Sequence, residues 1–160
     1  MILREATPDD LPPLLALCKK AWTGLGIPFD TDIDRFQKWA AGARIVVLYD
    51  TAGLAASLGA RSIETDRGPG FEVGLFVVDP DHPDSVKALD ALSLYACNLA
   101  LADQRPIVLS HDPKRTPVIY GRDLVGMDAQ DYGDRIQQIG DATTIAQRIL
   151  ERRPEWRPSL

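Results

Sequence analysis

The chain has little of what several classes of protein need. Its 160 residues include only two cysteines and two histidines, and the formal net charge is −5. Such an acidic chain lacks the basic footprint that nucleic-acid binding requires. The histidines, His82 and His111, fall in different expected elements, so no spacing typical of a metal site appears. We therefore expect neither a nucleic acid nor a metal ion as a ligand.

Long apolar runs are absent as well. No run approaches the roughly 20 residues that cross a bilayer, and the residues from Met1 to Glu5 lack the basic and then apolar pattern of a signal peptide. Cys18 and Cys97 both fall in apolar helical patterns. This placement favours two buried thiols in a reducing compartment over a disulfide. The sequence thus predicts a cytoplasmic protein with no membrane partner.

The hydrophobic pattern predicts a single α/β domain of alternating strands and helices. Thr7, Pro8, Asp9 and Asp10 are residue types that begin a helix, and Asp141 is a type that caps one. We expect residues 1–140 to form the domain, and residues 141–160 a C-terminal helix and tail that pack on it or on a partner. The expected strands span residues 2–5, 44–49, 54–63, 71–78, 106–110 and 132–139, and the expected helices span residues 7–22, 30–41, 85–102, 116–124 and 142–153.

The most informative segment runs from Gly70 to Ala102, where an expected strand leads through an acidic loop into a long helix. Such a helix start is a ready anion site, because its free N–H groups and its dipole point there. Here the loop contains Asp81, Pro83 and Asp84 instead of glycines. An acidic side chain at this place can cap the helix itself. The loop is either a structural helix start, which its acids favour, or a divergent phosphate loop.

The order of the expected elements, with a β-meander in the middle, resembles the GNAT (Gcn5-related N-acetyltransferase) superfamily. The segment from Leu3 to Leu11 is similar to the first strand and helix of many members, and Val78-Asp79-Pro80 matches the Val-x-Pro that ends their fourth strand. The resemblance covers residues 2–135. It implies an α/β (α+β) fold with a mixed central sheet flanked by helices on both faces. It also implies cofactor-binding residues: Phe76, Val77, Val78, Ser85, Val86 and Lys87.

The resemblance further implies catalytic candidates. Glu72 matches the place on the fourth strand where members often have a general base. Members often have a tyrosine as the general acid, and Arg122 occupies its place here. Tyr120 lies two residues before that place. His111, at a strand end, is a third acid or base candidate. Each also has a structural interpretation, which the sequence favours: an exposed strand carboxylate, a packing tyrosine and a polar loop residue.

Two functional hypotheses follow from the resemblance. The favoured one is a non-catalytic protein with a degenerate acetyl-CoA site and no cofactor, which docks to a protein partner through its C-terminal helix and tail. A phage virion component is one form of it, and a homo-oligomer is compatible with it. Trp22, Trp39 and Trp156 are candidate anchors. The alternative is an acetyl-CoA-dependent N-acetyltransferase that acts on a primary amine, with Glu72 or His111 as the base and Tyr120 as the acid.

Overall fold

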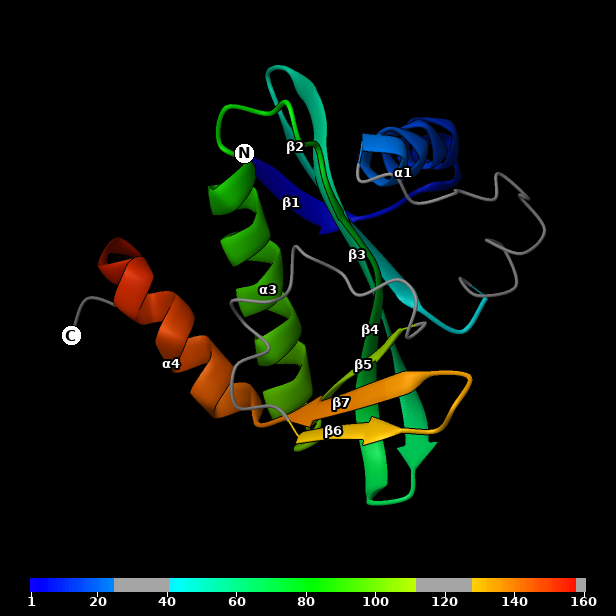
Figure 1. Ribbon diagram of the computed structural model, residues 1–160. Coiled ribbons are helices and arrows are strands. Elements are labelled where there is room, and N and C mark those ends of the chain that lie inside the picture. The colour runs from blue at the N-terminus through cyan, green and yellow to red at the C-terminus, as the bar shows by residue number, and fades with distance from the viewer. Residues whose placement is uncertain (25–40, 112–127, 158–160) are drawn as a thin grey trace. The chain divides into compact units, whose positions relative to one another are not determined.

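The computed structural model describes residues 1–24, 41–111 and 128–157 (Figure 1). The predicted helix 116–124 and almost all of the predicted helix 30–41 lie outside these residues. The described helices are α1 (Leu11–Gly24), α3 (Ser85–Ala102) and α4 (Ala142–Arg152), with short 3-10 turns η1 (Pro8–Asp10) and η3 (Pro154–Trp156). The described strands are β1 (Ile2–Glu5), β2 (Arg44–Asp50), β3 (Gly53–Thr65), β4 (Gly68–Val78), β5 (Ile107–His111), β6 (Asp128–Asp131) and β7 (Ile136–Gly140).

The described strands form a mixed sheet in the order β1-β2-β3-β4-β5-β7-β6. The pairs β1–β2 and β2–β3 are antiparallel, as are β5–β7 and β6–β7. In contrast, β4 and β5 are parallel, with Phe71 opposite Ile107 and Glu72 opposite Val108. Within the first unit, α1 packs against β4. This arrangement confirms the predicted α/β class with a mixed central sheet.

The chain divides into two compact units, of which the first contains residues 1–61 and 73–92. Its core lies between α1 and β4, where Leu14, Leu17 and Cys18 pack with Val77. These residues recur on α1 at helical spacing, so they form one apolar face. Burial raises the pKa of the Cys18 thiol to about 12. Cys18 and Cys97 are both buried and form no disulfide among the described residues, as predicted.

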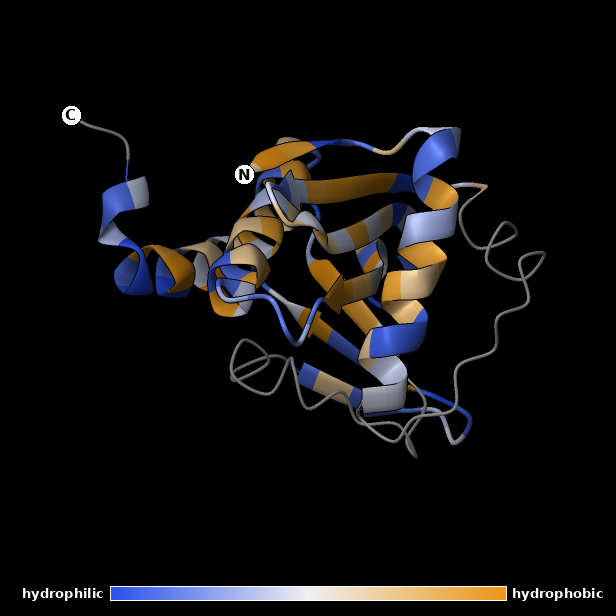
Figure 2. Ribbon diagram, turned by 90° about the horizontal axis from the view of Figure 1, so that it is seen from above, coloured by the Kyte–Doolittle hydropathy of each residue, from blue (hydrophilic) through white to orange (hydrophobic). Residues whose placement is uncertain are grey.

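The second unit contains residues 62–72 and 93–160. Helix α4 is amphipathic, with hydrophobic and hydrophilic residues side by side along it (Figure 2). Its apolar residues Ile145 and Ile149 are buried within the chain. Gly70 on β4 allows a close approach to β5, because a Cβ atom there would lie 2.5 Å from Cγ2 of Val108. The parallel β4–β5 pair therefore depends on a glycine at this position.

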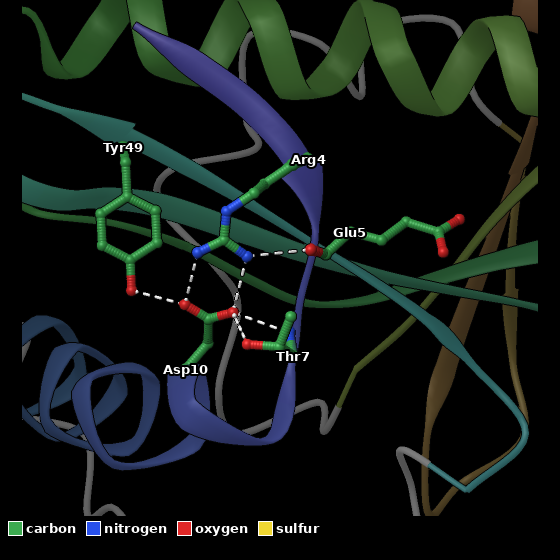
Figure 3. Close-up of polar contacts among 5 residues, drawn as sticks. All are labelled: Arg4, Glu5, Thr7, Asp10 and Tyr49. Atoms are coloured by element: carbon green, nitrogen blue, oxygen red, sulfur yellow. Dashed lines mark hydrogen bonds and ion pairs between the residues drawn. The ribbon is translucent and has the colours of Figure 1, made fainter.

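The start of α1 contains a buried carboxylate that the sequence prediction did not place. Asp10 is 4% exposed, and Arg4 donates to both its carboxylate oxygens at 2.7 and 2.9 Å. Tyr49 donates a third hydrogen bond and Thr7 two more, from its N–H and its hydroxyl (Figure 3). Thr7 is the N-cap residue of this first turn, as predicted, and its carbonyl also accepts the N–H of Asp10 at 3.0 Å. The aspartate closes this helix start, and Arg4 and Tyr49 neutralise and solvate it.

The predicted strand 132–139 is confirmed only from Ile136, where β7 begins, because the residues before it form the turn of a hairpin. β6 and β7 pair antiparallel, and Tyr132 to Arg135 form the turn between them. Gly133 adopts a φ of +85°, which favours glycine over other residues. The N–H of Gly133 also donates to the carboxylate of Asp131 at 2.8 Å. The segment reverses direction at a glycine that the sequence prediction treated as part of a strand.

Candidate functional site

The candidate site is the loop between β4 and α3, Asp79 to Asp84, within the first unit. The loop starts with a hydrogen bond from the N–H of Asp79 to the carbonyl of Ala55 on β3. Two tight turns follow, in which the N–H of His82 donates to the carbonyl of Asp79, and the N–H of Ser85 donates to the carbonyl of His82, each at 3.1 Å. The loop is therefore a compact turn although it contains no glycine.

His82 lies at the centre of this loop and is 8% exposed. Its Nε2 atom lies 2.5 Å from a carboxylate oxygen of Asp50, at the end of β2. Its Nδ1 atom accepts a hydrogen bond from the N–H of Asp84 at 3.1 Å. The sequence prediction had not assigned His82 a role, since its partner Asp50 lies 32 residues away.

The loop carboxylates are paired with a cation from α1. The ammonium group of Lys20 lies 2.6 Å from Asp79 and 3.0 Å from Asp81. Burial alone would raise the pKa of Asp79, but the hydrogen bond from Lys20 holds it below its ordinary value. Hydrogen bonds to Asp79 and Asp81 raise the pKa of Lys20. The repulsion of anions expected from Asp81 is therefore partly offset by a lysine that the sequence prediction missed.

The expected self-cap of α3 by Asp84 is wrong for the described residues. The carboxylate of Asp84 is exposed and accepts no hydrogen bond among them. Its backbone carbonyl takes the N–H of Ala88 at 2.9 Å, as the first bond of the helix. The N–H groups of Val86 and Lys87 meet no acceptor within the part of the chain that the structure describes. Two donors of the first turn are thus open, which is the feature that binds anions at helix starts.

The six predicted cofactor-binding residues lie on the two sides of this loop. Phe76, Val77 and Val78 are buried at the end of β4. Val77 packs on α1, so Phe76 and Val78 point to the other face of the strand. Ser85 and Lys87 are half-buried in the first turn of α3, and the side chain of Val86 is 51% exposed. Their role in binding a cofactor stays a prediction.

Of the three predicted catalytic residues, only Glu72 has a side chain that the structure describes. Glu72 lies on β4 in the second unit and is 9% exposed, so the expectation of an exposed carboxylate there is wrong. His111 is the last residue of β5, and Tyr120 lies outside the described residues. Their roles as acid or base stay predictions.

The structure also bears on metals and membranes. Among the described residues, no cluster of three or more histidine, cysteine, aspartate or glutamate side chains could hold a metal ion. In the same residues, none of the helices has the length and hydropathy that a membrane-spanning segment requires.

Comparison with known proteins identifies the fold. No protein-family model matches the sequence, and no curated protein matches it significantly. Among solved structures, the chain is similar to a GNAT-family acetyltransferase from Staphylococcus aureus Mu50, with a TM-score of 0.65 and 11% identity over 86% of this chain and 98% of that one. It is also similar to FeeM, an N-acyl amino acid synthase from uncultured soil microbes, with a TM-score of 0.61 and 15% identity over 92% and 97% of the two chains.

A third similar structure is the PaiA N-acetyltransferase from Thermoplasma acidophilum in complex with coenzyme A. Its TM-score is 0.64 and its identity 12%, over 88% of this chain and 98% of that one. Identities this low show the fold alone. The chain therefore has the GNAT fold, and the resemblance drawn from the sequence is confirmed at that level.

Proposed function

We propose that this GNAT-fold chain binds acetyl-coenzyme A and transfers its acetyl group to a primary amine. The observation that supports the proposal is the open first turn of α3, where the N–H groups of Val86 and Lys87 have no acceptor among the described residues. A pyrophosphate supplies the acceptors that such donors need. The nearby acids Asp79 and Asp81 are paired with Lys20. The loop thus fits a phosphate group despite its acidic sequence.

The remaining parts of the mechanism are assigned from the sequence. Acetyl-coenzyme A, when bound, supplies an activated acyl group and a thiolate leaving group. Glu72 or His111 would take a proton from the acceptor ammonium, and Tyr120 would return a proton to the leaving sulfur. A C–N bond forms and a C–S bond breaks, with no oxidant or reductant. The net charge of −5 suits a cationic amine as the acceptor.

The docking hypothesis has less support among the described residues. It requires an unoccupied surface on the C-terminal helix and tail, but the apolar face of α4 is already buried within the chain. Trp156 is half-buried and lies under the guanidinium of Arg153, 5.7 Å from its ring centre. Trp22 packs partly buried against the α1 core, and Trp39 lies outside the described residues. A virion role and the cellular location stay predictions.

Calorimetric titration with coenzyme A tests the proposal, with a matched pair of variants. Val86→Pro removes one open N–H at a place in the first turn where proline is tolerated. Val86→Ala keeps that N–H and removes only an exposed side chain. We expect wild type and Val86→Ala to bind alike, and Val86→Pro to bind about tenfold more weakly, since a hydrogen bond to a charged group is lost. Circular dichroism verifies that each variant folds.

Pantetheine, which lacks the pyrophosphate, provides the ligand control. It is expected to bind far more weakly than coenzyme A. Equal binding of the two ligands, or no binding of either, would contradict a phosphate site at α3. In the second case the docking hypothesis becomes the better account of this chain.

A further inference from the structure

The loop between β4 and α3 forms its tight turns around a histidine ring, where glycines are absent. His82 is 8% exposed, and both of its ring nitrogens have partners. Those partners come from different segments: Asp50 from the end of β2, and the backbone of Asp84 from the start of α3. The ring therefore joins the β2–β3 turn to the first turn of the helix.

The two partners determine which nitrogen holds the proton. The N–H of Asp84 is a donor, so Nδ1 must be an unprotonated acceptor. The proton then sits on Nε2 and is donated to the carboxylate of Asp50. That carboxylate is itself held in place by the N–H of Ala52 at 2.8 Å. Chiefly this backbone bond, together with the bond from His82, lowers the pKa of Asp50, which keeps it an ionised acceptor.

His82 also determines which N–H groups of the helix start remain open. Its ring takes the N–H of Asp84, and its carbonyl takes the N–H of Ser85. Its own N–H donates to the carbonyl of Asp79, which closes the preceding turn. The next two donors along the chain, at Val86 and Lys87, have no acceptor among the described residues. His82 thus accepts the N–H groups of Asp84 and Ser85 and leaves the next two N–H groups available for a ligand.

We infer that His82 is a positioning residue for a diphosphate ligand: held by Asp50 in its Nε2–H form, its ring shapes the β4–α3 loop so that the N–H groups of Val86 and Lys87 face the ligand. This inference rests on the proposed function and extends it. His82 acts through the backbone and does not itself touch the phosphate. The aspartates around it belong to the same arrangement, since Asp79 and Asp81 are bound to Lys20.

Two substitutions separate the hydrogen bond from the rest of the side chain. His82→Asn retains an acceptor near the position of Nδ1, whereas His82→Leu fills the space without one. Coenzyme A affinity is measured by calorimetry for both variants and for the wild type. We expect His82→Asn to bind within about threefold of the wild type and His82→Leu about tenfold more weakly.

Nuclear magnetic resonance gives a readout that does not depend on the ligand. The ring nitrogens of His82 are expected to show Nε2 protonated and Nδ1 as an acceptor. The Asp84 amide is expected to be protected from hydrogen exchange in wild type and His82→Asn, and to lose that protection in His82→Leu.

The outcomes distinguish this inference from the function on which it rests. Binding by the wild type together with unchanged binding by His82→Leu overturns the role of His82 and leaves the proposed function standing. A proton on Nδ1, or an unprotected Asp84 amide in the wild type, also overturns that role. A wild type that does not bind coenzyme A overturns the proposed function, and the positioning role is lost with it.

Discussion

The segments that lead into α1 and α3 contain the same residue types. The first turn is closed by a carboxylate at α1 and, among the described residues, has open N–H groups at α3. Each has a proline and several aspartates just before the helix. At α1, Asp10 turns back onto its own first turn and is held by Arg4, Tyr49 and Thr7. At α3, Asp84 stays exposed and two N–H groups of the helix remain open among the described residues. An aspartate near a helix start therefore does not determine whether that start is closed.

The difference comes from partners that are distant in the sequence. At α1 the arginine lies six residues from Asp10, on the strand that leads into the helix. At α3 the cation is Lys20, 59 residues from Asp79, and it pairs with the loop acids Asp79 and Asp81. His82 then occupies the N–H of Asp84. The same local sequence thus makes a structural cap in one place and leaves donors exposed in the other.

The largest effect is expected at the closed start. Asp10→Asn removes the charge that Arg4 pairs with in a nearly buried position. We expect the free energy of unfolding to fall by about 3 kcal/mol, measured by urea denaturation. Asp9→Asn is the matched control, since Asp9 is exposed and should change that free energy by less than about 0.5 kcal/mol. Equal effects of the two substitutions would mean that the buried network adds no stability.

Acid should weaken this same network. The hydrogen bonds from Arg4 are the main cause that lowers the pKa of Asp10 in the folded chain. A carboxyl with a lowered folded pKa adds stability above its unfolded pKa of about 3.9, and that stability is lost as the pH falls toward the folded value. The stability difference between wild type and Asp10→Asn should be complete above about pH 5 and shrink below about pH 4. Urea denaturation at a series of pH values measures it, and a difference independent of pH would refute the assignment.

A third helix start, at α4, provides an intermediate case. Asp141 accepts hydrogen bonds from the N–H and the hydroxyl of Thr144, at 2.9 and 2.8 Å. It is exposed and has no arginine partner among the described residues. Asp141→Ala should cost about 1 kcal/mol and lower the melting temperature by about 2–4 °C, as measured by thermal denaturation. A loss of stability as large as that of Asp10→Asn would show that burial does not cause the difference in stability between the two caps.

The smallest effect on stability is expected at the open start. Asp84→Asn removes a carboxylate that bonds to nothing in the described residues, so the unfolding free energy should change by less than about 0.5 kcal/mol. Coenzyme A affinity should rise about twofold to threefold, because one negative charge near the phosphate site is removed. Asp9→Asn removes the same charge at α1 and should leave this affinity unchanged. Asp84→Ala also removes the oxygens that could cap the helix and should likewise cost less than about 0.5 kcal/mol. A marked loss of stability in Asp84→Ala would restore the self-capped interpretation.

The sequence was sufficient for features that depend on local pattern. Helix α3 begins at Ser85 and ends at Ala102, as the apolar pattern predicts. The capping residue Asp141 and the buried thiols were also identified correctly. Each of these follows from residue type and spacing within one element. The GNAT resemblance likewise came from the order of elements and from the short motifs at Leu3–Leu11 and Val78–Pro80.

Features that depend on tertiary partners were missed. The ring of His82 could not be assigned, because Asp50 is brought to it only by the fold. The sequence favoured a first turn of α3 that is capped by an aspartate, because residue type alone places such a cap there. The open N–H groups of that turn were missed for the same reason. The turn at Gly133 had a local signal, a glycine followed by an aspartate. The loose alternation of apolar and polar residues over 132–139 was instead interpreted as one strand.

The most direct test of the central claim is an amide spectrum of the ¹⁵N-labelled protein during titration with coenzyme A. Our account predicts that the amide resonances of Val86 and Lys87 shift most among the residues of the first unit, while those at the start of α1 stay in place. Saturable shifts confined to other residues would contradict a phosphate site at α3. So would a spectrum that coenzyme A leaves unchanged.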